Sequence, residues 1–206
     1  MKKAISIIIS IVFCSGLFTF AGTNDKTIEN LKAAFKGEST ASAKYAAYAE
    51  KAKAEGYAQI AIMFSATSKA EAVHAANHKK VLEKLGQKTD EIKPEFVVKS
   101  TKENLDDALK GESYEIATMY PGFIATGKSE DVKDAVKSFR WAMDTEKKHQ
   151  TFYQNAIAAL NANKAASLPG VYWVCPKCGN TYDVAKTEPE CGFCGTKNDK
   201  FIKFGQ

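Results

Sequence analysis

Four helical segments of this chain each carry a glutamate in the middle of an otherwise apolar face. Between residues 25 and 161 alanine, lysine and glutamate dominate, and the main breaks fall near Gly56, at residues 86–94 and at residues 127–129. Apolar residues recur every three or four positions along each segment, which is the pattern of one helix face. The glutamates that interrupt these faces are Glu38, Glu71, Glu112 and Glu146.

A carboxylate surrounded by apolar side chains is costly unless its charge is paired or bound to a cation. A single case would be an ordinary surface glutamate, whereas one in each of four helices indicates a shared site. The connections between the segments are short, long and short, with the long one at residues 86–103. We therefore expect two helical hairpins, joined by a crossover, that form a four-helix bundle around a cation site.

Two of the segments add a histidine to the glutamate. Glu71 and His74 form Glu-x-x-His, and the same pattern recurs at residues 146–149. Residues three apart share a helix face, so a carboxylate and an imidazole can approach one metal from one helix. With Glu38 and Glu112 from the other two helices, this is the ligand set of a dinuclear carboxylate site. Carboxylates with imidazoles and no thiolate suit iron or manganese, and ligand type alone leaves zinc open.

The first and third segments share the tetrapeptide Lys-Gly-Glu-Ser, at residues 36–39 and 110–113. Glycine is about 1 kcal/mol less favourable than alanine inside a helix, so we expect Gly37 and Gly111 to let a neighbouring helix or side chain close over the metal pair. The inward face of the third segment is predicted to contain Leu105, Leu109, Glu112, Ile116, Met119 and Phe123.

The C-terminal part of the chain contains two Cys-x-x-Cys-Gly knuckles. Their cysteines are Cys175, Cys178, Cys191 and Cys194. This segment is too short for a large apolar core, so a metal is expected to hold it together. Four thiolates fit zinc or a single iron; neighbouring aromatic residues and the dinuclear site upstream favour iron, with a zinc ribbon as the alternative. A disulfide within each knuckle would be strained.

The N-terminus has the pattern of an export signal. Residues 1–3 are positively charged and an uncharged apolar stretch follows up to Asp25. We predict cleavage after Ala21 and export, with the periplasm as the expected location; an anchor formed by residues 4–22 is the alternative. The formal net charge of +5 is dispersed over lysines with a single arginine, which argues against nucleic-acid binding.

From Asp25 to Phe204 the chain resembles the rubrerythrin family. The stretches "FKGESTASAKYAAYAEKAKAEGYAQIA", "EAVH", "GESYEIATMYPGF" and "EKKH" and the two knuckles carry the resemblance. It implies an all-α ferritin-like four-helix bundle at residues 22–162, a linker at 163–170, and a small rubredoxin-like metal-knuckle β domain at 171–206. The implied cofactors are two non-haem irons in the bundle and one iron in the four-cysteine site.

The resemblance also implies a role for each ligand. Glu71 and Glu146 would bridge the two irons. One iron would be completed by Glu38 and His149, and the other by Glu112 with either Glu115 or His74. Glu115 is the additional carboxylate of this family, which exchanges with the histidine when the irons are reduced.

Three further residues stand close to the expected cluster in sequence. Tyr45 and Tyr120 match tyrosines that flank the irons in the family, although ordinary core packing would also explain them. Together with Glu115 they are the candidate catalytic residues. His78, four residues after His74, is interpreted as a polar neighbour of the cluster and not as a ligand.

The implied function is a peroxidase that reduces hydrogen peroxide with electrons passed through the iron of the four-cysteine site. Its partners would be an unidentified electron donor, such as a rubredoxin or a cytochrome, and a second copy of the chain. In the family one chain's rubredoxin site lies near another's di-iron site, which implies a homodimer or a higher oligomer. The alternatives are a ferroxidase or iron-handling protein, and a zinc-binding module with a structural bundle.

Overall fold

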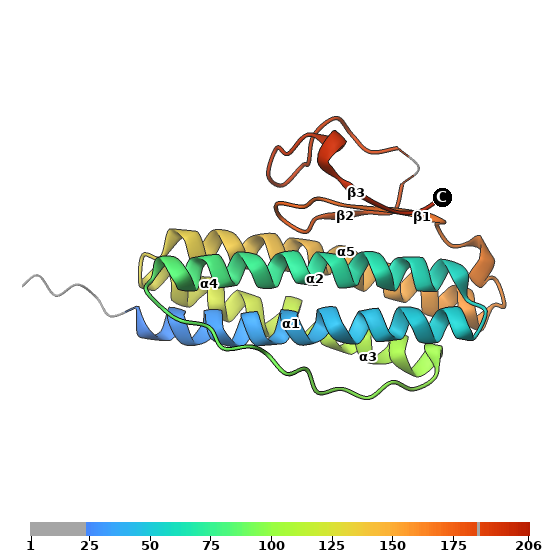
Figure 1. The fold of residues 1–206 in the computed structure, drawn as a ribbon, viewed down its shortest axis with the longest axis horizontal. Coiled ribbons are helices and arrows are strands. Elements are labelled where there is room, and N and C mark those ends of the chain that lie inside the picture. The colour runs from blue at the N-terminus through green and yellow to red at the C-terminus, as the bar shows by residue number, and fades with distance from the viewer. Residues whose placement is uncertain (1–23, 185) are drawn as a thin grey trace, which may run out of the picture.

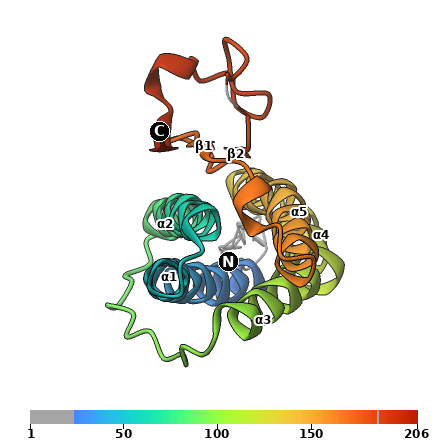
Figure 2. The same cartoon turned by 90° about the vertical axis from the view of Figure 1, so that its right-hand side faces the viewer.

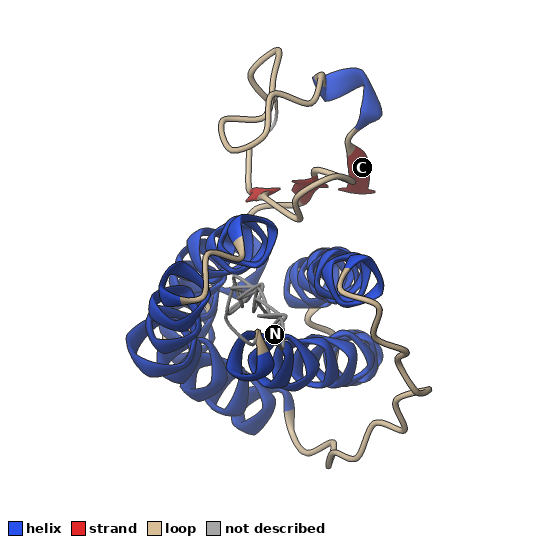
Figure 3. Ribbon diagram, turned by 90° about the vertical axis from the view of Figure 1, so that its left-hand side faces the viewer, coloured by secondary structure: helices blue, strands red, loops and turns tan. Residues whose placement is uncertain are grey.

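The structure, a computed structural model, describes residues 24–184 and 186–206 and confirms the predicted helical bundle (Figure 1). Two helical hairpins lie side by side, and strands occur only in the small C-terminal domain of the described chain (Figure 3). The helical elements are α1 (Asp25–Ala54), α2 (Ala58–Lys84), α3 (Thr101–Tyr114), η1 (Glu115–Met119), α4 (Tyr120–Ser129), α5 (Lys133–Asn161) and two short 3-10 turns, η2 (Ala165–Ser167) and η3 (Asn198–Lys200).

The long connection from α2 to α3 runs along the outside of the bundle to its opposite end (Figure 1). It ends in a capping box, in which the Ser100 hydroxyl accepts the backbone N–H of Glu103 while the Glu103 carboxylate accepts the Ser100 N–H. The carboxylate of Glu55, at the end of α1, also accepts the N–H of Thr101 at 2.8 Å. These bonds fix where the third helical segment starts relative to the first hairpin.

The third helical segment contains a π-turn that the sequence analysis did not predict. The N–H of Tyr120 donates to the carbonyl of Glu115, five residues earlier, and Pro121 has no N–H to continue the α pattern. The extra residue rotates the rest of the helix, so the predicted inward face is wrong beyond Glu112. Tyr120 and Ile124 are buried there, whereas Met119 and Phe123, two of the predicted positions, are only partly buried.

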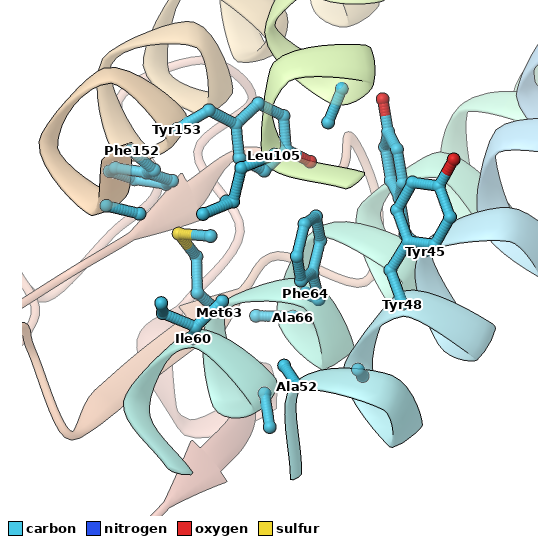
Figure 4. Close-up of a cluster of buried hydrophobic side chains, with 14 of the residues drawn as sticks. Tyr45, Tyr48, Ala52, Ile60, Met63, Phe64, Ala66, Leu105, Phe152 and Tyr153 are labelled. Carbon is cyan, nitrogen blue, oxygen red and sulfur yellow. The ribbon is translucent and has the colours of Figure 1, made fainter. Parts of the chain in front are cut away.

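Two apolar clusters fill the bundle, one on each side of the glutamates. One contains the aromatic residues Tyr45, Tyr48, Phe64 and Tyr153, with the Phe64 and Tyr153 rings 5.5 Å apart (Figure 4). The other is built around Leu31, Leu82, Tyr120 and Phe139. Because each long helix contributes to both clusters, its central carboxylate is held at the boundary between them.

The C-terminal domain lies across α2 and α5 (Figures 1 and 2). Its strands are β1 (Val171–Val174), β2 (Thr181–Tyr182) and β3 (Ile202–Gly205), and they form an antiparallel sheet in the order β2-β1-β3. Trp173 in the central strand is opposite Tyr182 on one side and Lys203 on the other. The sheet carries the first knuckle, which contacts the bundle at its two ligand histidines.

The glycines of the repeated tetrapeptide do not have the role that we expected. A Cβ added at Gly37 would meet no atom within 4 Å beyond the nearby backbone of its own helix. At Gly111 it would meet only the hydroxyl oxygen of Tyr45, at an ordinary contact distance of 3.9 Å. Since an alanine would fit at either position, close approach of a neighbouring helix does not explain these glycines.

The predicted signal at residues 1–21, and the alternative anchor at residues 4–22, lie outside the described residues. Within the described part of the chain, no helix is both long and apolar enough to span a bilayer.

Candidate metal centre

The bundle brings six of the predicted ligands together in two overlapping groups. Within each group the potential ligand atoms lie within 4.8 Å of one another, and every member is buried. One group consists of Glu38, Glu71, His74 and Glu146, and the other of Glu71, Glu112, Glu146 and His149. Glu71 and Glu146 belong to both groups, which is the arrangement that two bridging carboxylates require.

The two shared glutamates each present one oxygen to each histidine. His74 Nδ1 lies 2.9 Å from Glu71 Oε2 and 2.9 Å from Glu146 Oε1. His149 Nδ1 lies 3.0 Å from Glu71 Oε1 and 2.8 Å from Glu146 Oε2. The imidazoles therefore approach the carboxylate pair from opposite ends through the same ring nitrogen.

The expected partners of the single glutamates were wrong. Glu38 Oε1 lies 3.9 Å from His74 Nδ1, and Glu112 Oε1 lies 4.0 Å from His149 Nδ1. The reason is that α1 packs mainly against α2, and α3 against α5. Each single glutamate thus completes the group of the histidine on its neighbouring helix. Of the two candidates Glu115 and His74, it is His74 that lies in a ligand group, and it does so beside Glu38.

Burial and mutual repulsion perturb the titration of the metal-free site. Burial, and then the neighbouring carboxylates, hold the pKa values of Glu38 and Glu112 well above the ordinary value. Although burial alone lowers the pKa of His149, the charges of Glu71 and Glu146 raise it to about 9. Glu38, Glu112 and His149 thus favour their protonated forms, which indicates an excess of buried negative charge in the metal-free site. The two histidines, against the effect of burial, lower the pKa of Glu71 to about 2.

Several buried polar atoms of the cluster make no hydrogen bond of suitable geometry with the described residues, although some of them lie within 3.0 Å of one another. Five of them are Glu71 Oε1, Glu112 Oε2, Glu146 Oε1, Glu146 Oε2 and His149 Nδ1, and the sixth is His74 Nε2, which faces Gly179. Unpaired buried polar atoms are rare and costly in proteins, and these five belong to one ligand group. Cations bound there would satisfy all of them, so the residues present fit two metal ions.

The remaining candidates surround the cluster. Tyr45 donates its hydroxyl proton to Glu112 Oε1 at 2.9 Å, and Tyr120 donates to Glu38 Oε1 through a short hydrogen bond. Glu115 is the first residue of the π-turn and lies outside both ligand groups. Burial, followed by the charges of Glu146 and Glu71, raises its pKa well above the ordinary value. This environment therefore favours the protonated form of the Glu115 carboxyl group in the metal-free site.

The four cysteines of the knuckles form a third group, with no disulfide among them. Cys175 Sγ lies 3.5 Å from Cys194 Sγ, and Cys178 Sγ lies 3.5 Å from Cys191 Sγ. Four sulfurs at tetrahedral positions around a metal, with bonds of about 2.3 Å, would be ~3.8 Å apart. The knuckles therefore have the geometry that a single tetrahedral metal requires. Cys194 is partly exposed and the other three are buried.

The first knuckle rests directly on the two histidines of the same chain. The Thr181 hydroxyl lies 3.0 Å from His149 Nε2. A Cβ added at Gly179 would lie 2.2 Å from His74 Nε2, so only glycine allows this approach. Lys148 Nζ completes the contact by donating to Asn180 Oδ1 at 2.6 Å. The four-cysteine site and the dinuclear site are thus adjacent within one chain, whereas the resemblance implies adjacency between two subunits.

Some of these contacts had little signal in the sequence. Gly179 follows the second cysteine of a knuckle, which predicts a turn but not a histidine above it. His78 lies outside both ligand groups, in agreement with its interpretation as a polar neighbour. Burial, and then the charge of His74, lower the pKa of His78 to about 3. Its partner Ser138 is 60 residues away along the chain and was not predicted.

Comparison with known proteins gives the family. The Rubrerythrin family model matches residues 29–157. Rubrerythrin-2 of Clostridium acetobutylicum is 34% identical over 182 residues, which cover 88% of this chain and 98% of that protein. Nigerythrin of Nitratidesulfovibrio vulgaris is 34% identical over 181 residues, which cover 86% of each. A solved structure of nigerythrin in its fully reduced, all-ferrous state has a TM-score of 0.78 and 31% identity, covering 93% of this chain and 91% of that one. With its Glu/His di-iron site and its rubredoxin-like four-cysteine site, the chain belongs to the rubrerythrin family of di-iron oxidative-stress proteins.

Proposed function

We propose that this protein is a peroxidase that reduces hydrogen peroxide to water with electrons entering at the iron of the four-cysteine site. The reaction consumes two electrons and two protons for each peroxide and releases two waters. When bound, a pair of ferrous ions supplies both electrons and stabilises the hydroxide that leaves as the O–O bond breaks. The protein must then hold the ions, keep the site apolar apart from its ligands, and deliver protons.

The contact between the first knuckle and the histidines is the observation that carries the proposal. Thr181 touches His149 and Gly179 touches His74, while the cysteines of the same knuckle belong to the four-cysteine site. A protein that only oxidised and stored iron would have no use for a one-electron centre placed against both imidazoles. The adjacency favours a redox enzyme over the ferroxidase or iron-handling alternative.

The chain's own residues account for orientation and for one proton. Tyr45 and Tyr120 hold the oxygens of Glu112 and Glu38 through hydroxyl donors, which fixes the rotamers of both carboxylates. Glu115 begins the π-turn beside the cluster, and burial first, then the charges of Glu146 and Glu71, raises its pKa, which favours its protonated form. A carboxyl group in that state can act as a general acid toward the leaving oxygen.

A single-turnover experiment tests the proposal. The iron-loaded protein is reduced without oxygen, one equivalent of peroxide is added, and the visible absorption of the ferric four-cysteine centre is followed. Its rapid return in the wild type, slowed by about 10²- to 10⁴-fold in Glu115→Ala, is expected if Glu115 is a general acid. Glu29→Ala, which removes an exposed helical glutamate, is the matched control and should react normally.

Two outcomes would contradict the proposal. A reduced four-cysteine centre that does not respond to peroxide, in protein that still oxidises added ferrous iron, would favour the ferroxidase alternative. Zinc in the cysteine site of protein purified from its source, with no visible absorption, would favour a structural role for the C-terminal domain.

The electron donor is proposed to be a small redox protein such as a rubredoxin or a cytochrome. Cys194, the partly exposed cysteine, borders a surface groove of about 710 Å³ that also contains Lys137 and Arg140. This groove offers a place where a donor can approach the metal of the four-cysteine site. We also propose a homodimer or higher oligomer in solution, which light scattering at several protein concentrations tests.

Export to the periplasm is proposed from the charge and hydropathy of residues 1–21. The mass of the protein isolated from its source decides between the possibilities. A chain that begins at Gly22 supports cleavage and export, whereas an intact N-terminus recovered with the membrane fraction supports the anchor formed by residues 4–22.

A further inference from the structure

Two neighbouring cavities form a continuous surface beside the four-cysteine site. Cys194, the partly exposed cysteine, borders the groove of about 710 Å³ between α5 and the second knuckle. A second cavity, of about 220 Å³, is lined by α2, by α5 and by Lys177 of the first knuckle. Lys137 and Trp141 line both cavities. We call the joined lining of the two cavities the basic face, for the charges that it carries.

The basic face has more positive charge than its own carboxylates can neutralise. Its cationic side chains are Lys80, Lys84, Lys133, Lys137, Arg140 and Lys177. Its carboxylates are those of Asp134 and Asp144. Asp134 already binds Lys84 at 2.8 Å and Lys137 at 3.2 Å, and Asp144 binds Lys147 at 2.7 Å. Both carboxylates are therefore occupied by lysines, and positive charge remains in excess.

Three cations of the basic face have no carboxylate partner. No carboxylate oxygen of the described residues lies within 4.0 Å of the charged nitrogens of Lys80, Arg140 or Lys177, and all three side chains are exposed. Asn77 holds Lys177 in place, since its Nδ2 donates to the Lys177 carbonyl oxygen at 2.9 Å. The three charges come from α2, α5 and the first knuckle, and each lines a cavity together with Trp141.

Trp141 connects the basic face with the four-cysteine site. Its side chain packs against the apolar cluster that contains the three buried cysteines, and Lys137 Nζ lies 5.7 Å from its ring centre. Phe193 packs against the same cluster and lines the groove beside Cys194. A protein bound to this face would thus approach the metal of the four-cysteine site through aromatic rings and an exposed sulfur ligand.

We propose that the basic face is the docking surface for an electron-carrier protein whose own surface is acidic. The inference rests on the proposed function for its purpose and deepens it by assigning the donor a charge and a place. In each encounter one electron leaves the reduced carrier and converts the ferric iron of the four-cysteine site to ferrous. No bond forms or breaks, and no proton moves. Two encounters supply the two electrons that the reduction of one peroxide consumes.

An anionic membrane could also be attracted by such charge, but the basic face suits it less well. Segments that bind in the membrane interface expose large apolar side chains to it. The large apolar side chains that line the two cavities, such as Trp141 and Phe193, are buried or partly buried. The large apolar side chains that are exposed in the described chain lie elsewhere: Val97, Val98, Tyr114 and Val184. A hollowed, charged surface favours a protein partner.

Two matched sets of substitutions separate local docking from overall charge. The face variant replaces the three unpaired cations of the basic face: Lys80→Gln, Arg140→Gln and Lys177→Gln. The control variant replaces three other exposed lysines, which also have no carboxylate within 4.0 Å in the described chain and lie on α1, α3 and α4: Lys32→Gln, Lys102→Gln and Lys128→Gln. Both variants remove the same charge from surface positions, so a difference between them reports the location of binding.

The first measurement does not depend on activity. The chain has two tryptophans, so ¹⁵N-tryptophan labelling of the zinc-loaded protein gives two indole N–H signals, which Trp141→Phe assigns. The probe is an unlabelled, zinc-loaded rubredoxin with an acidic surface. It should shift the Trp141 signal to saturation and leave that of Trp173, which lines neither cavity, unchanged.

The dependence of this binding on charge is equally specific. The affinity for the rubredoxin should fall about tenfold in the face variant and remain that of the wild type in the control variant. It should also weaken as salt is raised from about 0.1 M to about 1 M, because the Debye length falls from roughly 10 Å to roughly 3 Å. A basic cytochrome c should not shift the Trp141 signal.

Three results would overturn the inference. The first is the absence of a saturable shift of the Trp141 signal with the acidic probe. The second is an equal loss of affinity in the face and control variants, which would mean that only the net charge matters. The third is binding to vesicles of phosphatidylglycerol and phosphatidylcholine in equal parts that the face variant loses, with no binding of the rubredoxin. That result would assign the face to a membrane.

The second measurement separates this inference from the proposed function. In iron-loaded protein supplied with peroxide and reduced rubredoxin, the face variant should need about ten times more rubredoxin than the wild type for half of its maximal rate. Its single turnover after reduction by dithionite should be normal, because no carrier takes part. If the wild type consumes peroxide and the face variant needs no more rubredoxin, the inference is wrong. If the wild type does not consume peroxide, the peroxidase proposal fails, and the tryptophan signals alone decide whether the face binds the carrier.

Discussion

Replacing Gly179 by alanine should loosen the C-terminal domain from the bundle by pushing it away from His74. Gly179 has a φ of +84°, in the left-handed region, where a residue with a Cβ loses roughly 1–2 kcal/mol. The added Cβ would stand 2.2 Å from His74 Nε2 and 3.2 Å from the carbonyl oxygen of Ala70. His74 cannot retreat, because Glu71 and Glu146 hold its Nδ1 at 2.9 Å from the other side. Overpacking of this kind costs typically ~1–3 kcal/mol, which brings the expected total to about 2–5 kcal/mol.

Gly195 provides the matched control for this substitution. It occupies the same place in the second knuckle, where its N–H donates to the Cys191 carbonyl as that of Gly179 does to Cys175. Its φ is +69°, and an added Cβ would meet nothing nearer than Glu190 Oε2 at 4.0 Å. Gly195→Ala should therefore show the backbone strain alone, roughly 1–2 kcal/mol.

Native-state hydrogen exchange of the zinc-loaded protein measures the difference. The amides of β1 and β2 report the free energy of opening of the C-terminal domain. The contact with His74 should make Gly179→Ala less protected than Gly195→Ala by about 1–3 kcal/mol, a factor of roughly 5–150 in exchange rate. Equal loss of protection in the two variants would refute the argument that close approach to the histidine requires glycine at position 179.

Three other predictions concern the charges around the two sites. In metal-free protein the pKa of His149 is about 9 against an ordinary 6.5, and that of Glu112 is also raised, so the folded state binds more protons than the unfolded state. The resulting stability should be present at pH 6 and reduced by about 2 kcal/mol at pH 9, as measured by urea denaturation. Bound metal should remove this difference between the two pH values. Lys148→Met removes a positive charge near the thiolates of Cys178 and Cys191. It should lower the reduction potential of the iron bound there by ~40 mV, for an interaction of about 1 kcal/mol, in a spectroelectrochemical titration. The exposed neighbour variant Lys147→Met should leave the potential unchanged, and an equal shift in both variants would contradict a specific effect of Lys148. Tyr45→Phe deprives Glu112 Oε1 of its donor and should weaken metal binding about 10- to 100-fold in competition with a chelator, whereas unchanged affinity would mean that Tyr45 serves only to pack the core.

The sequence was sufficient for those features that depend on residues close together in the chain. Glu71 and His74 share a helix face because they are three positions apart, and the same local rule joins the histidine and glutamate of α5. Each knuckle is likewise a short turn whose two sulfurs must converge. Helix periodicity and breaker residues were enough to predict the four-helix bundle and its crossover, since neither depends on which helix packs against which.

The sequence was not sufficient where a partner comes from a distant element. The pairing of Glu38 with His74 depends on which helices lie side by side, and helical periodicity contains no information on that. The π-turn at Glu115 shifts the inward face by one residue through a hydrogen bond that a regular helix does not make. Glycine at positions 37 and 111 suggested a close approach that the packing does not contain.

The sequence by itself determined which side chains could bind metal, because the spacing of ligands along a helix or a turn is set by local backbone geometry. Only the tertiary structure decided what those ligands face. His78 and Ser138 are 60 residues apart and form a hydrogen bond because α2 packs against α5. Gly179 contacts His74 because the first knuckle packs against α2. Such contacts are fixed by the packing of whole elements, which depends on all of their buried surfaces together and not on any motif that a short stretch of sequence contains.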